Sequence, residues 1–221
     1  MISIIIPTLN ESELILNNVQ SLQRIRNQGL CEIIIIDGKS QDDTWSLIRN
    51  LVDKLVIIEP KRASQLNAGG DIAKGDILLF LHADTYISEK NIIELENNKT
   101  DFHWGFFSLG LSQNSIKYKL LEKCINLRSY FFNCATGDQG IFMKNEIFKR
   151  INGFPDIELM EDLEVCKLLK EISEPLIIKS KIITSARKWE KDGFYLTVLK
   201  MRLFRILYSL GLSAKILHKY Y

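Results

Sequence analysis

The chain has little of what marks secreted, membrane-spanning or nucleic-acid-binding proteins. No apolar run reaches the ~18 residues that cross a bilayer, and a net charge of +2 gives no argument for a nucleic-acid partner. Its 12 glycines and four prolines are too scattered to form a low-complexity linker. The four cysteines include no CxxC pair, so we expect buried free thiols in a reducing compartment. They are Cys31, Cys124, Cys134 and Cys166.

Glycine-rich nucleotide-binding loops are also missing. The first apolar run is followed by PTLNE rather than GxGxxG, and no GxxxxGK[ST] segment occurs. LNAGGDIAKG follows a helical pattern instead of opening a helix. A nucleotide bound by this chain would therefore be held by carboxylates and a metal.

The first residues do not resemble a secretory signal, because no basic segment precedes the apolar run ISIIIP and the polar TLNESE follows it. We therefore expect a cytoplasmic protein, with attachment to the inner face of a membrane as an alternative. A length of 221 residues with 46% hydrophobic residues favours one compact domain over 1–221.

Apolar runs of four to six residues alternate with helical patterns over the first 85 residues. β-Branched runs separated by helices indicate a mostly parallel sheet covered by helices on both faces, an α/β fold. Expected strands are 2–6, 33–36, 55–58 and 77–81, and expected helices are 13–26, 44–51 and 62–73.

The second half has a mixed α+β pattern. Aromatic residues crowd 102–107, where antiparallel strands are expected, and they either fill the core or stack on a sugar. Helices are expected over 116–132 and from Met160 onward. We divide the chain into a nucleotide-binding half (1–100), a second half (101–185) and a C-terminal amphipathic region (186–221).

Polar side chains follow three of the expected parallel strands, and the carboxyl ends of such strands meet at one edge of the sheet, where ligands bind. Taken singly, Asn10 is equally typical of a helix cap and Asp84 of a turn. Their joint occurrence favours a ligand site, with Asp84 as a candidate metal ligand. The three groups are Pro7, Thr8, Asn10 and Glu11; Asp37; and His82 and Asp84.

Five ordered segments resemble the motifs of the family 2 glycosyltransferases, which have the GT-A fold. The nucleotide-side segments are SIIIPTLNE (3–11), IIIIDGKSQDDT (33–44), RASQLNAGG (62–70) and FLHADT (80–85). The acceptor-side segment is TGDQGIFMKNEIFKRINGFPDIELMEDLEVCKLLK (136–170). The resemblance implies an inverting, metal-dependent enzyme that moves one sugar from a UDP-, GDP- or dTDP-linked donor to an acceptor hydroxyl.

The resemblance also implies donor-side roles. Asp37 would contact the base, Glu11 the ribose and Arg62 the diphosphate. Asp84 matches the last position of the family's DxD motif, whose carboxylate holds Mn²⁺ or Mg²⁺ against the diphosphate. The implied donor-binding set is Pro7, Thr8, Asn10, Glu11, Asp37, Arg62, His82 and Asp84.

His82 departs from this pattern, because it stands where the first Asp of DxD is usual. Three roles are open: a hydrogen bond to ribose, a nitrogen ligand that favours Mn²⁺ over Mg²⁺, or packing.

On the acceptor side, the resemblance implies that Asp162 is the general base, because an acceptor hydroxyl must lose its proton as it attacks the anomeric carbon. Asp138, Gln139 and Glu161 would bind the acceptor. The alternatives are a charged first helical turn for Glu161 and Asp162, favoured by the helix dipole, and a plain tight turn around Asp138.

The C-terminal region is basic and amphipathic. Where processive members of the family carry QxxRW, this chain has Ser185, Lys188 and Trp189, so transfer of a single sugar is expected. The helix either lies on an anionic membrane or packs on the core or a second copy, as in a homodimer.

Three competing functions were weighed. A glycosidase needs two carboxylates on opposite sides of the scissile bond, which adjacent Glu161 and Asp162 do not readily supply. A sugar-nucleotide pyrophosphorylase would have a glycine-rich N-terminal loop. A catalytically degenerate GT-A protein that binds a nucleotide or a membrane is the non-enzyme alternative, motivated by His82.

Overall fold

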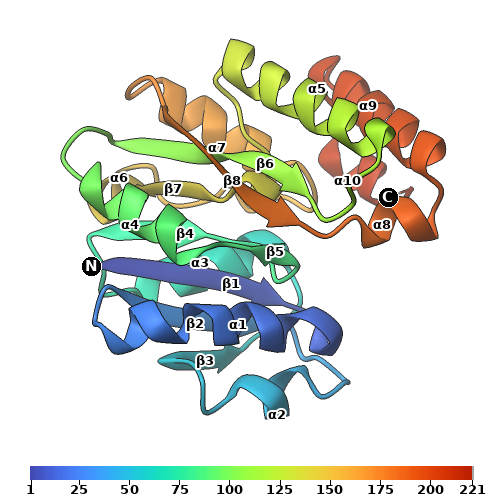
Figure 1. Cartoon of the computed structure of the whole chain (residues 1–221). Coiled ribbons are helices and arrows are strands. Elements are labelled where there is room, and N and C mark those ends of the chain that lie inside the picture. The colour runs from blue at the N-terminus through green and yellow to red at the C-terminus, as the bar shows by residue number, and fades with distance from the viewer. Residues whose placement is uncertain (221) are drawn as a thin grey trace.

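A computed structural model describes residues 1–220, and one eight-stranded sheet runs through them in the order β3-β2-β1-β4-β7-β6-β8-β5 (Figure 1). Strands β1 to β4 are parallel to one another, β7 is antiparallel to β4 and β6, β6 is parallel to β8, and β5 is antiparallel to β8. The strands are β1 (Ile2–Thr8), β2 (Cys31–Asp37), β3 (Lys54–Ile57), β4 (Ile77–Phe80), β5 (Thr85–Tyr86), β6 (Trp104–Leu111), β7 (Ile141–Lys144) and β8 (Leu176–Thr184).

Helices cover both faces of this sheet, because alternate residues of the buried strands point to opposite sides. In β1, Ile4 and Ile6 belong to one hydrophobic cluster and Ile5 to the other. Helices α1 and α4 pack on the first cluster, and α3, α6 and α7 on the second. The helices are α1 (Ser12–Asn27), α2 (Thr44–Ile48), α3 (Arg62–Ile72), α4 (Glu89–Asn97), α5 (Ile116–Phe132), α6 (Asn145–Arg150), α7 (Glu161–Lys170), α8 (Arg187–Lys191), α9 (Phe194–Ser209) and α10 (Ala214–His218).

The expected parallel sheet is confirmed, with three local differences. Helix α2 ends at Ile48 rather than 51. Strand β6, expected to be antiparallel, is so toward β7 only, since it runs parallel to β8. Cys31 and Cys166 are buried free thiols, whereas Cys124 and Cys134 are only half-buried.

The aromatic cluster of 102–107 lies in the core, which was one of its two expected roles. Phe102, Trp104, Phe106 and Phe107 are each at most 5% exposed. A third hydrophobic cluster joins the inner faces of α5, α8 and α9. Within residues 1–220, every helix is too short or too polar to cross a bilayer.

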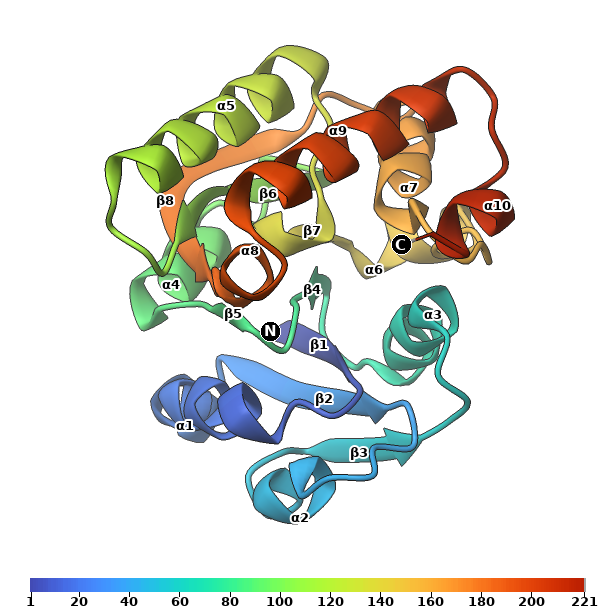
Figure 2. The same cartoon turned by 90° about the vertical axis from the view of Figure 1, so that its right-hand side faces the viewer.

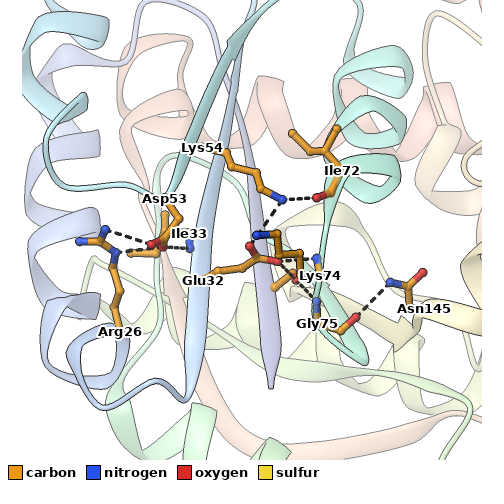
Figure 3. A network of polar contacts seen from close by, with 10 residues as sticks. Arg26, Glu32, Ile33, Asp53, Lys54, Ile72, Lys74, Gly75 and Asn145 are labelled. Carbon is orange, nitrogen blue, oxygen red and sulfur yellow. Dashed lines mark hydrogen bonds and ion pairs between the residues drawn. The ribbon is translucent and has the colours of Figure 1, made fainter.

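A polar network ties the amino-terminal ends of the strands together (Figure 3). The buried carboxylate of Glu32 accepts hydrogen bonds from Ser3 Oγ (2.5 Å) and from the backbone N–H of Lys74 (2.6 Å). Ser3 Oγ also accepts from the N–H of Gly75 at 2.8 Å, and Lys54 Nζ lies 3.7 Å from Glu32. The predicted ligand residues lie at the opposite, carboxyl-terminal ends of these strands.

Candidate functional site

Asp37 ends β2 beside Thr8 at the end of β1, and its carboxylate organises both loops. Thr8 Oγ1 donates to Asp37 Oδ2 at 2.9 Å, and Ser40 donates through its N–H (2.8 Å) and its hydroxyl (2.6 Å). Gln65 of α3 donates to the Thr8 carbonyl at 3.0 Å. Asp37 is only 2% exposed, so its contact with a base stays a prediction, whereas its role in holding the loops is direct.

Asn10 joins the loops after β1 and β2 and does not cap α1. Its backbone is left-handed, with φ of 55°. Its N–H donates to Ser40 Oγ at 2.9 Å, and its Oδ1 accepts the N–H of Gln41 at 2.8 Å. Pro7, in the last part of β1, is half-buried. The two residues thus shape the edge of the predicted donor site.

Arg187, on the short helix α8, is a site residue that the sequence analysis missed. Its Nη2 lies 2.9 Å from Glu11 Oε2 and its Nη1 lies 3.3 Å from Glu13 Oε2, across more than 170 positions of sequence. The N–H of Ser185 donates to the Asp84 carbonyl at 3.0 Å, which fixes the start of this segment. Both views place α8 next to β5 (Figures 1 and 2). Position 187 lies within the expected C-terminal region. Its place shortly after a strand is the one sequence signal that could have identified it as a candidate site residue.

Asp84 lies among other carboxylates. Burial raises its pKa above the ordinary range, and the charges of Glu11 and Asp138 raise it further, while Arg62 and Arg187 oppose this. Such a cluster is short of positive charge, so a dication suits it. No group of three or more His, Cys, Asp or Glu side chains in residues 1–220 could hold a metal alone. The residues fit Mn²⁺ or Mg²⁺ held by Asp84 together with diphosphate oxygens and water.

His82 packs against Gly137. A Cβ at position 137 would lie 2.3 Å from His82 Nε2, and this nitrogen is buried without a hydrogen-bond partner. Burial, and then the charge of Arg62, lower the pKa of His82 well below its usual value, so the ring is neutral. The Nε2 atom packs against Gly137, and the choice among the three predicted roles of His82 stays a prediction.

Asp162 lies at the start of α7, where two backbone N–H groups orient it. Gly137 donates to its Oδ2 at 3.0 Å, and Leu163 donates to its Oδ1 at 2.8 Å. The helix follows Met160, whose φ of 70° is left-handed. The carboxylate is thereby tied to the turn that also carries Asp138.

Glu161 pairs with Arg62, which opens α3. Arg62 Nε lies 3.0 Å from Glu161 Oε1. Even so, burial and the neighbouring Asp162 outweigh the half-exposed Arg62 and raise the pKa of Glu161. The arginine predicted for the donor side and the glutamate predicted for the acceptor side thus meet.

The turn at Gly137–Gln139 is held from inside the protein. Gln139 is fully buried, and its Oε1 accepts from Ser129 Oγ (2.7 Å) and from the N–H of Thr136 (3.1 Å). Because its amide is not exposed, a contact between Gln139 and the acceptor stays a prediction. Asp138 has a buried Oδ1 without a partner, and burial raises its pKa.

The site residues thus converge from both halves of the chain. The charges of Glu11 and Asp138 raise the pKa of Asp84, and the charge of Asp162 helps to raise the pKa of Asp138.

Comparison with known proteins finds similar sequences and similar folds. Residues 3–101 match the model of glycosyl transferase family 2. A relative from Haemophilus influenzae, described as an uncharacterized glycosyltransferase, is 26% identical over 191 residues, which are 80% of this chain and 75% of the relative.

Two solved structures share the fold. S. aureus TarS 1–349 in complex with UDP-GlcNAc matches with a TM-score of 0.67 and 16% identity over 83% of this chain and 58% of that one. The mannosyltransferase PcManGT from Pyrobaculum calidifontis, in complex with GDP-Man and Mn²⁺, matches with a TM-score of 0.58 and 20% identity over 82% and 56%. The chain spans less than two thirds of the length of these two proteins. It spans three quarters of the Haemophilus relative. The family match over residues 3–101, the relatives and the shared GT-A architecture together support a family 2 glycosyltransferase.

Proposed function

We propose that this chain transfers one sugar from a nucleoside-diphosphate sugar to an acceptor hydroxyl, with inversion at the anomeric carbon. The observation that carries the proposal is the link between Asp162 and the 137–139 turn, whose Asp138 raises the pKa of Asp84. A base and a metal-binding carboxylate thus belong to one site. Single displacement needs these two groups on opposite sides of the reacting carbon.

Asp162 acts as the base. Its two backbone hydrogen bonds fix the carboxylate plane, and each oxygen keeps lone pairs for the acceptor hydroxyl. The hydroxyl proton passes to Asp162 as the oxygen attacks the anomeric carbon and the bond to the diphosphate breaks. Asp138 and Glu161 lie beside this point and bind the acceptor.

Arg62 and Arg187 bind the donor diphosphate, and Glu11 and Asp37 contact the ribose and the base. When Mn²⁺ or Mg²⁺ is bound at Asp84, it stabilises the negative charge that develops on the leaving diphosphate. The TarS and PcManGT complexes hold UDP-GlcNAc and GDP-Man, which supports a UDP- or GDP-linked donor here. A dTDP-linked donor is included in the test below.

We also propose that the protein attaches to the cytoplasmic face of a membrane. The outer face of α9 is apolar without covering residues, and residues 194–220 contain no Asp or Glu but five Lys or Arg. An anionic bilayer matches both properties. Exposed members are Tyr195, Leu196, Leu199, Leu203 and Ile206. Co-sedimentation with anionic vesicles tests this, and sedimentation equilibrium without lipid tests the alternative that a second copy covers the face.

A thermal-shift panel tests the donor assignment. UDP, GDP, dTDP, CDP and ADP are each added with and without Mn²⁺ to the wild type, to Asp84→Asn and to Asp71→Asn, a control exposed on α3. At 100-fold its Kd, the correct nucleotide should add about 2.7 kcal/mol of stability. We expect one nucleoside diphosphate to raise the Tm, and to do so only when Mn²⁺ is present. This rise should occur in the wild type and in Asp71→Asn but not in Asp84→Asn.

A matching sugar-transfer assay separates the enzyme from a degenerate GT-A protein. Nucleotide binding without hydrolysis or transfer of any linked sugar would favour the degenerate reading. No shift with any nucleotide would contradict the donor site itself.

A further inference from the structure

Two arginines of the acceptor side have buried nitrogen atoms without hydrogen-bond partners. They are Nε of Arg128, on α5, and Nη1 of Arg205, on α9. Neither guanidinium forms an ion pair with a carboxylate of residues 1–220. A guanidinium nitrogen that is buried without a hydrogen-bond partner is costly, so the two atoms call for an explanation.

Contacts place Arg128 beside the turn that holds Asp162. Its Nη2 lies 3.1 Å from Ser129 Oγ and 3.5 Å from both Thr136 Oγ1 and Gln139 Oε1. The latter two distances are long for hydrogen bonds and leave donor capacity unused. The same turn gives its Gly137 N–H to Asp162.

Arg205 is directed to the same place from the other side. One helical turn further along α9, Tyr208 donates its hydroxyl to Glu164 Oε1 of α7 at 2.7 Å. Residues three apart lie on the same face of a helix, so Arg205 faces the start of α7 as well.

The two guanidinium groups act on each other. Burial, and then the charge of Arg205, lower the pKa of Arg128 to about 10, while Asp138 and Asp162 oppose this from nearby. Two like charges that are both partly withdrawn from water repel each other, and an anion between them would relieve that repulsion.

We propose that Arg128 and Arg205 form a subsite for a phosphate-type oxyanion on the acceptor, held beside Asp162. Two guanidinium forks match the oxygens of a phosphate group in geometry and charge. This inference rests on the proposed transfer reaction, and it adds that the acceptor carries an anionic group near its reacting hydroxyl.

The surroundings allow two sources for that group. Helices α5 and α9 lie side by side (Figure 2), and the outer faces of both are apolar. A phosphate at a lipid surface could reach the arginines from there, and so could the phosphate of a soluble acceptor. On α5 the exposed apolar residues are Ile116, Leu120, Leu127, Tyr130, Phe131 and Phe132.

The first test uses inorganic phosphate as the probe, against chloride at equal ionic strength. It compares the wild type with Arg205→Met, Arg128→Met and the control Arg202→Gln, an exposed arginine on α9. At ten times its Kd, phosphate should raise the Tm of the wild type and of Arg202→Gln by about 3 to 5 °C. The shift should be absent in both Met variants.

Without phosphate, Arg205→Met should have a higher Tm than the wild type, because the substitution removes a half-buried positive charge that repels Arg128. A merely structural arginine would give the opposite sign, and that result would overturn the proposal. So would a phosphate shift that survives both Met variants and disappears in Arg62→Gln, since phosphate would then bind on the donor side.

The second test separates the two sources of the anion. Vesicles of phosphatidylglycerol and of phosphatidylcholine are sedimented with the wild type, Arg205→Met and Arg202→Gln. A loss of phosphatidylglycerol binding in Arg205→Met well beyond that in Arg202→Gln identifies a lipid phosphate. Equal losses, with the phosphate shift intact in the wild type, identify a soluble one.

The metal-dependent nucleotide shift is measured on the same variants. If it persists in Arg205→Met while phosphate has no effect even on the wild type, the subsite is wrong and the donor site stands. If no nucleotide shift occurs in any protein, the proposed function fails independently of the subsite.

Discussion

The backbone N–H of Gly137 donates a 3.0 Å hydrogen bond to Oδ2 of Asp162, so the turn and the predicted base have a fixed relation. The same glycine leaves room for His82, whose Nε2 would lie 2.3 Å from a Cβ at position 137. One small residue therefore sets the position of groups on both sides of the reaction.

Gly137→Ala should move the turn or the imidazole of His82. The backbone of Gly137 is outside the left-handed region, so the clash alone causes the effect. Overpacking of this kind costs about 1–3 kcal/mol of stability, and a displaced base should lower kcat by ~10- to 100-fold. Adding His82→Ala removes the clashing ring and should restore the Tm. Full activity in Gly137→Ala alone would contradict the coupling.

Asp162→Asn should abolish transfer and leave donor binding unchanged. The amide oxygen can still accept the Gly137 hydrogen bond, while the amide nitrogen cannot accept the one from Leu163, and the amide cannot take the proton of the acceptor. A general base contributes roughly 10²- to 10⁴-fold, so kcat should fall by that factor. Steady-state kinetics and the nucleotide shift measure the two effects, with exposed Glu158→Gln as the control. Retained turnover would remove Asp162 from the base role.

Arg187→Gln should weaken binding of the nucleoside diphosphate more than that of the nucleoside. Arg187 pairs with Glu11 and lowers the pKa of Asp84, so its charge reaches the predicted diphosphate position. We expect a loss of about 10-fold for the diphosphate, or ~1.4 kcal/mol, measured by calorimetry with Mn²⁺. Lys191→Gln, exposed at the end of α8, is the control. Tighter binding in Arg187→Gln would show instead that Arg187 blocks Glu11.

Glu161 should make the protein less stable as the pH rises toward neutrality. Burial and Asp162 raise its pKa from 4.5 to about 7, so between these values the folded state holds a proton that the unfolded state has lost. The contribution of Glu161 is therefore fully present below pH 4.5 and lost as the pH rises through about 7. Glu161→Gln removes this titration. The free energy of unfolding of the variant, relative to that of the wild type, should therefore increase by on the order of 2 kcal/mol between pH 5 and 8. Urea unfolding at each pH measures this gain, and parallel curves would contradict it.

The nucleotide-side fold followed from local pattern. Runs such as Ile33–Ile36 are short, β-branched and bounded by helices, which specifies a buried parallel sheet. The partner of β6 did not follow, because one strand lies between an antiparallel and a parallel neighbour and its apolar run satisfies either. That choice depends on the order of distant strands.

The site divides in the same way. Residues at strand ends, such as Asp37 and Asp84, were placed by their position after an apolar run. Arg187 was not, because its pairing with Glu11 spans 176 positions and no spacing rule links them. The buried state of Gln139 was equally hidden, since it depends on Ser129 from a different helix.

The network around Glu32 has a consequence for the motions of the molecule. It fastens the amino ends of β1, β2 and the segment before β4 through a buried carboxylate, whereas the parts of the opposite loops that lie beyond the buried Asp37 are joined by more exposed contacts such as Asn10 with Ser40. Local opening should therefore start at the ligand edge and stop before Glu32. Amide hydrogen exchange would be fast at the loops and slow at Gly75, so the two ends of a single strand would differ in protection.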